Sequence, residues 1–146
     1  MARDDRLEGK TLKIAEKMLR DVTKILEQTG VGYFLDAGTL LGLVRENRVA
    51  TRKYLLFNGH RLRDLYIKRP IDDELCWTEG SKKIVLKAIP KRFYEETRQL
   101  EFDGKNYSVP RDCEGYLKHH YGKDWRTPIK EWNFLEDDGS TKSVIA

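Results

Sequence analysis

The sequence predicts a single domain of the α+β class, in which helices pack against a mixed or antiparallel sheet. Three observations support this prediction. Residues 11–28 repeat apolar side chains every three to four positions, which is typical of an amphipathic helix. Residues 53–109 instead contain short β-prone segments separated by glycine turns. The length of 146 residues suits one domain with a real core and does not divide comfortably into two.

The first third of the chain is expected to be mainly helical. Gly30 is a natural stop for the helix over residues 11–28. The apolar residues 33–35 predict a short buried strand, and a turn of Asp, Ala and Gly then leads into a short helix at 39–45. The order helix, strand, turn and helix is therefore expected before residue 48.

Three hairpins are predicted after residue 48, each built around a glycine turn. The turns are Asn58-Gly59, Glu79-Gly80 and Asp103-Gly104. The corresponding strands are expected at 53–57 and 62–67, at 74–78 and 82–86, and at 101–102 and 106–109. Pro90 can open a short helix at 91–96, and a second helix is expected at 111–120. The tail from residue 121 is rich in turns and aromatic residues.

Composition limits the class of protein. Apolar residues make up 39% of the chain, charged residues 36%, and the net charge is +4. Seven Tyr, five Phe and three Trp need a core in which to pack, so a folded protein is expected. The small basic excess fits an anionic small-molecule substrate as easily as nucleic acid, and it fits a solvated surface best of all. No nucleic-acid partner is expected, because the aromatic residues show no recognised nucleic-acid signature.

The cysteines and the distribution of apolar residues predict a location. Cys76 and Cys113 are far apart and form no CxxC pair, so free thiols are expected in place of a disulfide or a zinc site. The first residues lack the apolar stretch of a signal peptide, and no apolar run approaches the roughly 18 residues of a membrane helix. The expected location is therefore cytoplasmic, with no transmembrane segment.

The strongest candidate site lies in YFLDAGTLLGLVR, at residues 33–45. Gly38 lets the backbone approach a ligand closely, the N–H groups of the following helix point at an anion, and Thr39 adds a hydroxyl. This pattern predicts a small phosphate-binding turn. The structural alternative is that Asp36 only caps the helix and Gly38 only makes a tight turn.

Aromatic and histidine residues in the second half are expected to be structural. His119 and His120 adjoin on a predicted helix, so they cannot face one metal together and are expected to be solvated. The aromatic residues expected in a core or in a C-terminal hydrophobic clasp are Trp77, Phe93, Tyr94, Phe102, Trp125 and Trp132.

Two blocks of sequence, in this order, resemble one family. The first is LDAGTLLGLVR at residues 35–45, and the second is IPKRFYEETRQLEFDGKNYSVPRDCEGYLKHHYGKDWRTP at 89–128. Both resemble the LicD family of phosphorylcholine-transferase-like proteins, which are related to fukutin and have a nucleotidyltransferase-type fold. The resemblance implies a nucleotidyltransferase-like mixed sheet with flanking helices in one LicD-like domain over residues 1–146.

The resemblance also implies a reaction. A phospho-linked group, such as phosphorylcholine or a polyol phosphate, would pass from a CDP-activated donor such as CDP-choline to a hydroxyl of a cell-surface glycan. Gly38 and Thr39 would hold the donor phosphates, Asp36 would organise the turn, and Arg45 would lie behind it. Magnesium would be the cofactor and would bridge the donor phosphates.

The sequence departs from the family where the magnesium ligands should stand. In the family, an acidic cluster of the form Asp-Asp-Asp-x-Asp follows the Leu-Gly-x-Val-Arg segment within a dozen residues. Here residues 46–69 read ENRVATRKYLLFNGHRLRDLYIKR, with no carboxylate between Glu46 and Asp64. Asp64 matches the family's later-strand acid, so the resemblance makes it the catalytic residue and magnesium ligand. Three explanations remain open: an active-site segment is missing near residues 49–53, the protein is a naturally shortened or degenerate relative, or the chain has been trimmed deliberately.

Other acids and other functions remain open at this point. The run of Asp72, Asp73 and Glu74 follows a predicted turn and is expected to face water. The missing acidic cluster motivates an alternative function, that of a catalytically impaired LicD-like protein that binds a nucleotide or a glycan. A basic nucleic-acid binder is the weakest hypothesis, because it rests on the pI of about 9.0 and the Lys/Arg excess.

Overall fold

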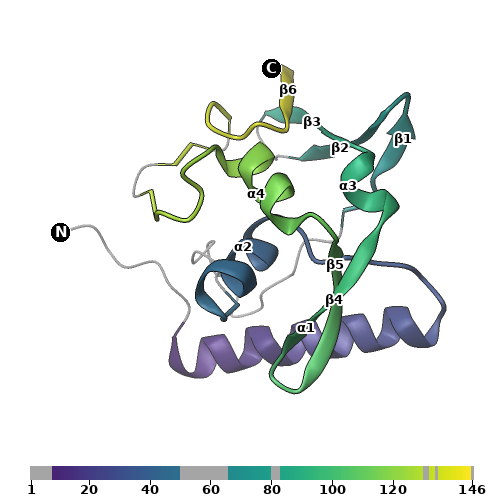
Figure 1. Cartoon of the computed structure of the whole chain (residues 1–146), viewed down its shortest axis with the longest axis vertical. Coiled ribbons are helices and arrows are strands. Elements are labelled where there is room, and N and C mark those ends of the chain that lie inside the picture. The colour runs from purple at the N-terminus through teal and green to yellow at the C-terminus, as the bar shows by residue number, and fades with distance from the viewer. Residues whose placement is uncertain (1–7, 50–65, 80–82, 130–131, 134, 146) are drawn as a thin grey trace. The chain divides into compact units, whose positions relative to one another are not determined.

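The computed structural model describes residues 8–49, 66–79, 83–129, 132–133 and 135–145 (Figure 1). The chain forms two compact units, each built from two stretches of sequence. Unit 1 comprises residues 1–64 and 97–109, and unit 2 comprises residues 65–96 and 110–146. Helices and antiparallel strands occur together, which confirms the α+β class. One domain over residues 1–146 stays a prediction.

The main element of unit 1 is α1, Gly9–Gln28, which confirms the predicted amphipathic helix. Ala15, Leu19 and Thr23 are buried at a spacing of four residues, so they form one inward stripe. The Thr23 hydroxyl lies in this stripe and donates to the Leu19 carbonyl oxygen at 2.8 Å, which satisfies a polar group in an apolar setting. Gly30 follows the helix with φ of 71°, as expected of a glycine just beyond a helix end.

A hairpin of β4, Thr97–Phe102, and β5, Lys105–Pro110, belongs largely to unit 1 and confirms the third predicted hairpin. Asp103 and Gly104 have φ values of 49° and 69°, and two positive φ angles are what a two-residue type I′ turn requires. Two ion pairs join this hairpin to α1. Arg20 Nη2 lies 2.5 Å from Asp103 Oδ2, and Lys105 Nζ lies 2.8 Å from Glu27 Oε2.

Glu27 also accepts a hydrogen bond from the Tyr33 hydroxyl, at 2.8 Å. The hydrogen bond from Lys105, and to a lesser extent the one from Tyr33, lowers the pKa of Glu27. Burial, with the neighbouring Glu27 carboxylate, raises the pKa of Tyr33 to about 12. The surroundings therefore hold the Tyr33 phenol neutral. The stability that the folded protein gains from this raised pKa is complete below pH 10 and is lost as the pH rises through 12.

The predicted strand at residues 33–35 is not formed in the described part of the chain. Leu35 is buried, and its N–H donates to the Ser108 carbonyl oxygen of β5 at 2.8 Å. The apolar run therefore anchors the segment by burial beside β5 without joining the hairpin as a strand. The next element is α2, Ala37–Glu46, which confirms the helix expected at 39–45 and buries Leu40 and Leu43.

Unit 2 contains a four-stranded antiparallel sheet in the order β1-β2-β3-β6. Its strands are β1, Arg69–Ile71; β2, Glu74–Glu79; β3, Ile84–Pro90; and β6, Thr141–Ile145. The pairing of β2 with β3 confirms the second predicted hairpin. Neither β1 nor β6 was predicted, since both are short and mostly exposed and lack an apolar alternation. Most of the first predicted hairpin, at 53–67, lies outside the described residues.

Two helices of unit 2 pack together: α3, Arg92–Glu95, and α4, Cys113–Tyr121. The Asp112 carboxylate caps α4 by accepting from the Gly115 N–H at 2.8 Å. Phe93 of α3 meets Tyr116 of α4 edge to face, with ring centroids 6.0 Å apart. Trp77, Phe93 and Trp125 are buried, as predicted, whereas Tyr94, Phe102 and Trp132 are half-buried.

Two further observations concern the cysteines and the length of the helices. Cys76 and Cys113 are both free, as expected, and the Cys113 thiol donates to the Pro110 carbonyl oxygen at 2.9 Å. Among the described helices, none is long and apolar enough to cross a membrane.

Candidate functional site

The predicted phosphate turn lies at the start of α2, in unit 1. Asp36 is extended, with φ of −129° and ψ of 163°, and its carboxylate accepts from the Ala37 N–H at 2.8 Å. Ala37 itself has φ of 43°. This left-handed conformation costs a non-glycine residue roughly 1–2 kcal/mol, and such outliers concentrate at functional sites. The turn is therefore strained at the residue between Asp36 and Gly38.

Gly38 and Thr39 are the second and third residues of α2 and are half-buried. The N–H groups of the first turn of an α-helix have no acceptor within the helix, and they carry its positive partial charge. The structure thus brings together three of the predicted residues, Asp36, Gly38 and Thr39, in the order that an anion site at a helix start requires.

Arg45 is placed differently. It belongs to the last turn of α2, so its backbone lies about 10 Å along the helix axis from Gly38. Its Nη2 atom lies 2.7 Å from Glu46 Oε1, and both side chains are mostly shielded, with exposed fractions of 17% and 19%. The guanidinium is therefore partly neutralised by its neighbour, and the described contacts do not join it to the turn.

Asp64, the predicted catalytic residue and magnesium ligand, lies outside the described residues. Asp72 and Asp73 are exposed at the turn between β1 and β2, as predicted, and Glu74 pairs with Lys142 at 2.7 Å. Residues 8–49, 66–79, 83–129, 132–133 and 135–145 contain no group of three or more His, Cys, Asp or Glu side chains that could hold a metal ion. Magnesium takes several oxygen ligands, so the described residues do not by themselves fit this cofactor.

A second polar cluster, in unit 2, was not predicted from the sequence. Lys87, in the middle of β3, is fully buried, and its Nζ atom lies 2.7 Å from both Asp138 Oδ2 and Thr141 Oγ1. Asp138 Oδ1 also accepts from the N–H of Ser140 at 2.8 Å and from its hydroxyl at 2.6 Å. Lys87, Asp138, Ser140 and Thr141 are together called the Lys87–Asp138 cluster below. One feature of the sequence could have indicated this cluster: Lys87 stands inside the otherwise apolar run IVLKAIP. A charged side chain that is buried in such a run needs a buried partner.

His120 belongs beside this cluster, so the prediction that it is solvated is wrong. It is only 5% exposed, its Nδ1 atom lies 3.2 Å from Asp138 Oδ1, and its ring stacks on Tyr116. The spacing of Cys113, Tyr116, Leu117 and His120 follows the period of a helix, and all four are buried on one face of α4. That spacing could have identified His120 as a core residue.

The Lys87–Asp138 cluster can stabilise unit 2 but is closed to a substrate. It links β3 to the segment that precedes β6. The side chains of Lys87 and Asp138 are only 0% and 3% exposed. Catalysis needs groups that reach the reacting atoms, and a group shut away from solvent cannot do so without opening the fold. The cluster is therefore a structural ion pair.

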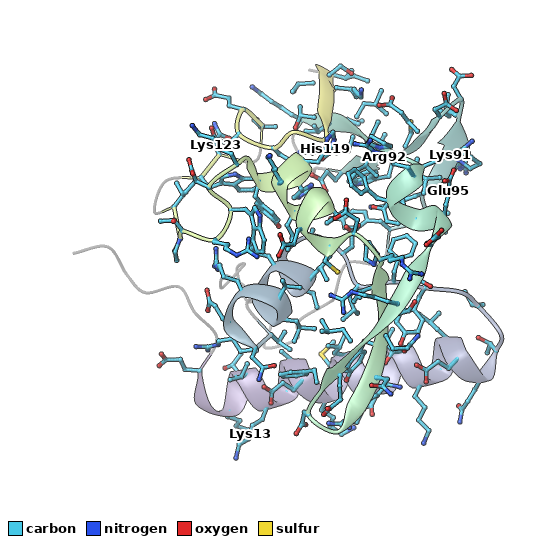
Figure 2. The ribbon with its side chains drawn as sticks, in the orientation of Figure 1. Lys13, Lys91, Arg92, Glu95, His119 and Lys123 are labelled. Atoms are coloured by element: carbon cyan, nitrogen blue, oxygen red, sulfur yellow. The ribbon has the colours of Figure 1, made fainter. Side chains whose placement is uncertain are left out.

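The neighbouring histidine, His119, lines an open depression of about 510 Å³ between α3 and α4. Arg92, Phe93, Asp112 and Lys118 also line it, and Figure 2 shows Arg92 and His119 near one another, with Lys91 and Glu95 on the α3 side. Burial lowers the pKa of His119, and the charges of Lys142 and Arg92 lower it further. The His119 side chain is half-buried, which agrees only partly with the prediction that it is solvated.

Comparison of the chain with models of known protein families, with curated proteins and with solved structures finds no match.

Proposed function

We propose that the chain is a LicD-like transferase with a nucleotidyltransferase-type sheet. It moves a phospho-linked group, phosphorylcholine or a polyol phosphate, from a CDP-activated donor to a glycan hydroxyl. The observation that carries the proposal is the strained turn at the start of α2. Ala37 has a left-handed backbone there, and the next two residues are the Gly and Thr of the family-like motif.

Binding at this turn would use three of the chain's own groups. The first-turn N–H groups of Gly38 and Thr39 would donate to anionic oxygens of the donor, with the helix dipole adding attraction. The Thr39 hydroxyl would supply one further hydrogen bond. Asp36 would hold the turn through its bond to the Ala37 N–H. Holding the donor phosphates in a fixed geometry is a large part of catalysis for phosphoryl chemistry.

Asp64 and magnesium complete the proposal by resemblance alone. Magnesium, once bound, would neutralise charge on the donor phosphates, and Asp64 is the residue of this chain that the resemblance assigns to it. The described residues contain no group of three or more His, Cys, Asp or Glu side chains that could hold the ion. The residues at the start of α2 are therefore the ones to which the proposal gives a role in holding the donor.

One specific observation favours a second function. The stretch between Glu46 and Asp64 contains no carboxylate, whereas the family has its paired metal ligands there. A protein with the phosphate turn but without those ligands would bind a nucleotide or a glycan without turnover. This catalytically impaired binding protein is the alternative to the transferase.

Calorimetric titration with CDP-choline and CTP, with and without magnesium, tests both functions. We expect Thr39→Val to weaken binding roughly tenfold or more, because a hydrogen bond to a charged group is lost from a site of the same shape. Thr11→Val is the matched control, since Thr11 is also half-buried and is also the third residue of its helix, α1. Absence of heat with either nucleotide, under both conditions, would overturn the transferase and the nucleotide-binding form of the alternative.

Donor hydrolysis separates the transferase from the binding protein. The transferase predicts a measurable rate that is abolished in Asp64→Asn while nucleotide binding persists. Binding without any hydrolysis would favour the alternative.

A further inference from the structure

The lysines of α1 gather on one side of the helix, in unit 1. All four are exposed, and they are called the lysine stripe below: Lys10, Lys13, Lys17 and Lys24. An α-helix turns by about 100° per residue, so their spacings of three, four and seven residues place them within roughly 60° of arc. The stripe extends over about 21 Å along the helix axis, on the side away from the buried residues Ala15, Leu19 and Thr23.

The charge of the lysine stripe is mostly left unused within unit 1. Arg20, the other basic residue of α1, pairs with Asp103 and so holds the turn of the hairpin. Within the described parts of the chain, the stripe makes one ion pair, between Lys17 and Asp21 at 2.5 Å. Four lysines less the charge of Asp21 leave a net charge of +3 on this side of the helix.

Two isoleucines of α1 are exposed beside the lysine stripe. Ile14 is 45% exposed and Ile25 is 58% exposed. They are eleven residues apart, which is about three turns, so both lie on the same flank of the stripe. Lysines beside exposed aliphatic side chains are typical of a helix that lies on an anionic membrane surface. In that arrangement the lysines contact the headgroups, and the aliphatic side chains reach the boundary of the acyl chains.

The composition of this face favours a lipid surface over a nucleic acid. The stripe consists of lysines alone, whereas the planar fork of arginine is the group that matches nucleic-acid phosphates. A lysine ammonium supplies charge without a fixed geometry, which suits a surface of mobile headgroups. A bilayer also offers an apolar region for Ile14 and Ile25, and a phosphate backbone does not.

We propose that the outward face of α1 binds an anionic lipid bilayer, with the lysine stripe on the headgroups and Ile14 and Ile25 at the boundary of the acyl chains. Figure 2 shows the side chain of Lys13 directed away from the helix. None of these residues takes part in the phosphate turn at the start of α2. The inference therefore does not rest on the proposed transferase activity.

Sedimentation of the protein with lipid vesicles tests the proposal. One set of vesicles contains phosphatidylcholine alone, and in the other set half of this lipid is replaced by phosphatidylserine, which is anionic. We expect the protein to sediment with the phosphatidylserine vesicles at low salt and to stay in solution with the neutral ones. In about 1 M salt, where the Debye length is only about 3 Å, the binding should be lost.

Charge variants show whether the lysine stripe makes the contact. Lys13→Gln combined with Lys24→Gln should weaken binding to phosphatidylserine vesicles roughly 25-fold, at about fivefold for each lysine. The matched control is Lys83→Gln combined with Lys123→Gln, since both are exposed lysines of unit 2 and the change removes the same charge. Asp21→Asn should strengthen binding about fivefold, because it removes the acid that is paired with the stripe.

A variant of one isoleucine shows whether the bilayer itself is entered. Ile25→Ser should weaken binding roughly threefold or more, because an aliphatic side chain no longer leaves water on binding. Ile67→Ser is the matched control, since Ile67 is an exposed isoleucine of unit 2. Its binding to the vesicles should equal that of the wild type.

Three results would overturn the proposal, provided that circular dichroism shows folded proteins. The first is equal sedimentation of the wild type with neutral and with phosphatidylserine vesicles at low salt. The second is an equal loss of binding in the two lysine pairs, which would reduce the effect to net charge. The third is binding of duplex RNA that is tighter than that of the vesicles and unchanged in Ile25→Ser, which would make this face a nucleic-acid surface.

Two further measurements keep the test decisive. If the variant with both Lys13→Gln and Lys24→Gln is unfolded, the gain of binding in Asp21→Asn carries the comparison, and its absence would overturn the proposal. Thr39→Val should leave vesicle binding unchanged, so failure here is distinguishable from failure of the phosphate turn.

Discussion

Two ion pairs, one in each unit, lie in opposite settings. In unit 1, Arg20 and Asp103 pair at the surface, with side chains 41% and 64% exposed. In unit 2, Lys87 and Asp138 pair in the interior, with side chains 0% and 3% exposed. Solvent screens an exposed pair, and its formation orders two long side chains, so such pairs contribute little. A buried pair is costly to form and far more costly to break, because one charge is then left without a partner.

This difference teaches where each unit is sensitive. The hairpin of unit 1 is joined to α1 by surface ion pairs that salt can weaken, whereas the Lys87–Asp138 pair of unit 2 lies in the interior, where salt hardly reaches it. The chain also offers a way to observe unit 2 alone. All three tryptophans, Trp77, Trp125 and Trp132, belong to unit 2, so tryptophan fluorescence reports on its unfolding.

The largest expected effect is that of Asp138→Ala. The change removes the main partner of a buried lysine and the acceptor of two Ser140 hydrogen bonds. We expect the free energy of unfolding of unit 2 to fall by about 3 kcal/mol, the lower end of the usual cost of breaking a buried ion pair, because Glu79 Oε1 remains 3.4 Å from Lys87 Nζ. Urea denaturation followed by tryptophan fluorescence measures this change.

Two controls make that comparison sharper within unit 2. Glu114→Gln breaks an exposed pair with Arg126, whose side chains are 69% and 59% exposed, and should cost less than about 1 kcal/mol. The double change Lys87→Met with Asp138→Asn removes both charges and should recover most of the loss. Equal effects of Asp138→Ala and Glu114→Gln would contradict the distinction between buried and exposed pairs.

Gly139→Ala tests the segment that carries Asp138 and is expected to have the next largest effect. A Cβ atom at Gly139 would lie 1.9 Å from the backbone carbonyl oxygen of His119, which cannot swing away as a side chain could. We expect a loss of roughly 1–3 kcal/mol, as for overpacking in a core, visible in the same fluorescence experiment.

Gly32→Ala is the control for Gly139→Ala, and circular dichroism measures its free energy of unfolding. A Cβ atom there meets no heavy atom within 4 Å, and its φ is not in the positive range. We expect no loss, and at most a gain of about 1 kcal/mol. If the Gly139→Ala protein is as stable as the wild type, the segment around Gly139 is not held tightly against α4.

The elements most accurately predicted from the sequence are those whose signal is local. The period of residues 11–28 predicts α1, and the Asp103-Gly104 pair predicts a tight hairpin because both residues accept positive φ. The strand β6 could not be predicted, because residues 141–145 are mostly exposed and gain their order by pairing with β3. Pairing partners distant in sequence leave no local pattern.

The same division applies to the candidate sites. The turn at Asp36, Gly38 and Thr39 could be predicted, since its residues are adjacent in the chain. The Lys87–Asp138 cluster could not, because its two charges are 51 residues apart and only folding brings them together. Lys87 alone signals that some partner must exist, and nothing in the sequence identifies which acid it is.

The smallest expected effect belongs to the surface pair of unit 1. Arg20→Gln removes the ion pair with Asp103 and the weaker bond from Arg20 Nη2 to the Asp103 carbonyl oxygen, at 3.2 Å. We expect the free energy of unfolding, measured by circular dichroism of the helices, to fall by less than about 1 kcal/mol at low salt. In 1 M salt, where the Debye length is only about 3 Å, the difference from the wild type should shrink further. Asp138→Ala should keep its full effect in the same salt, because its charges are buried. If Arg20→Gln instead lowers the free energy of unfolding by the same amount at low and high salt, the guanidinium stabilises unit 1 by packing on the hairpin. The two ion pairs would then differ in their packing contacts and not in how far solvent screens their charges.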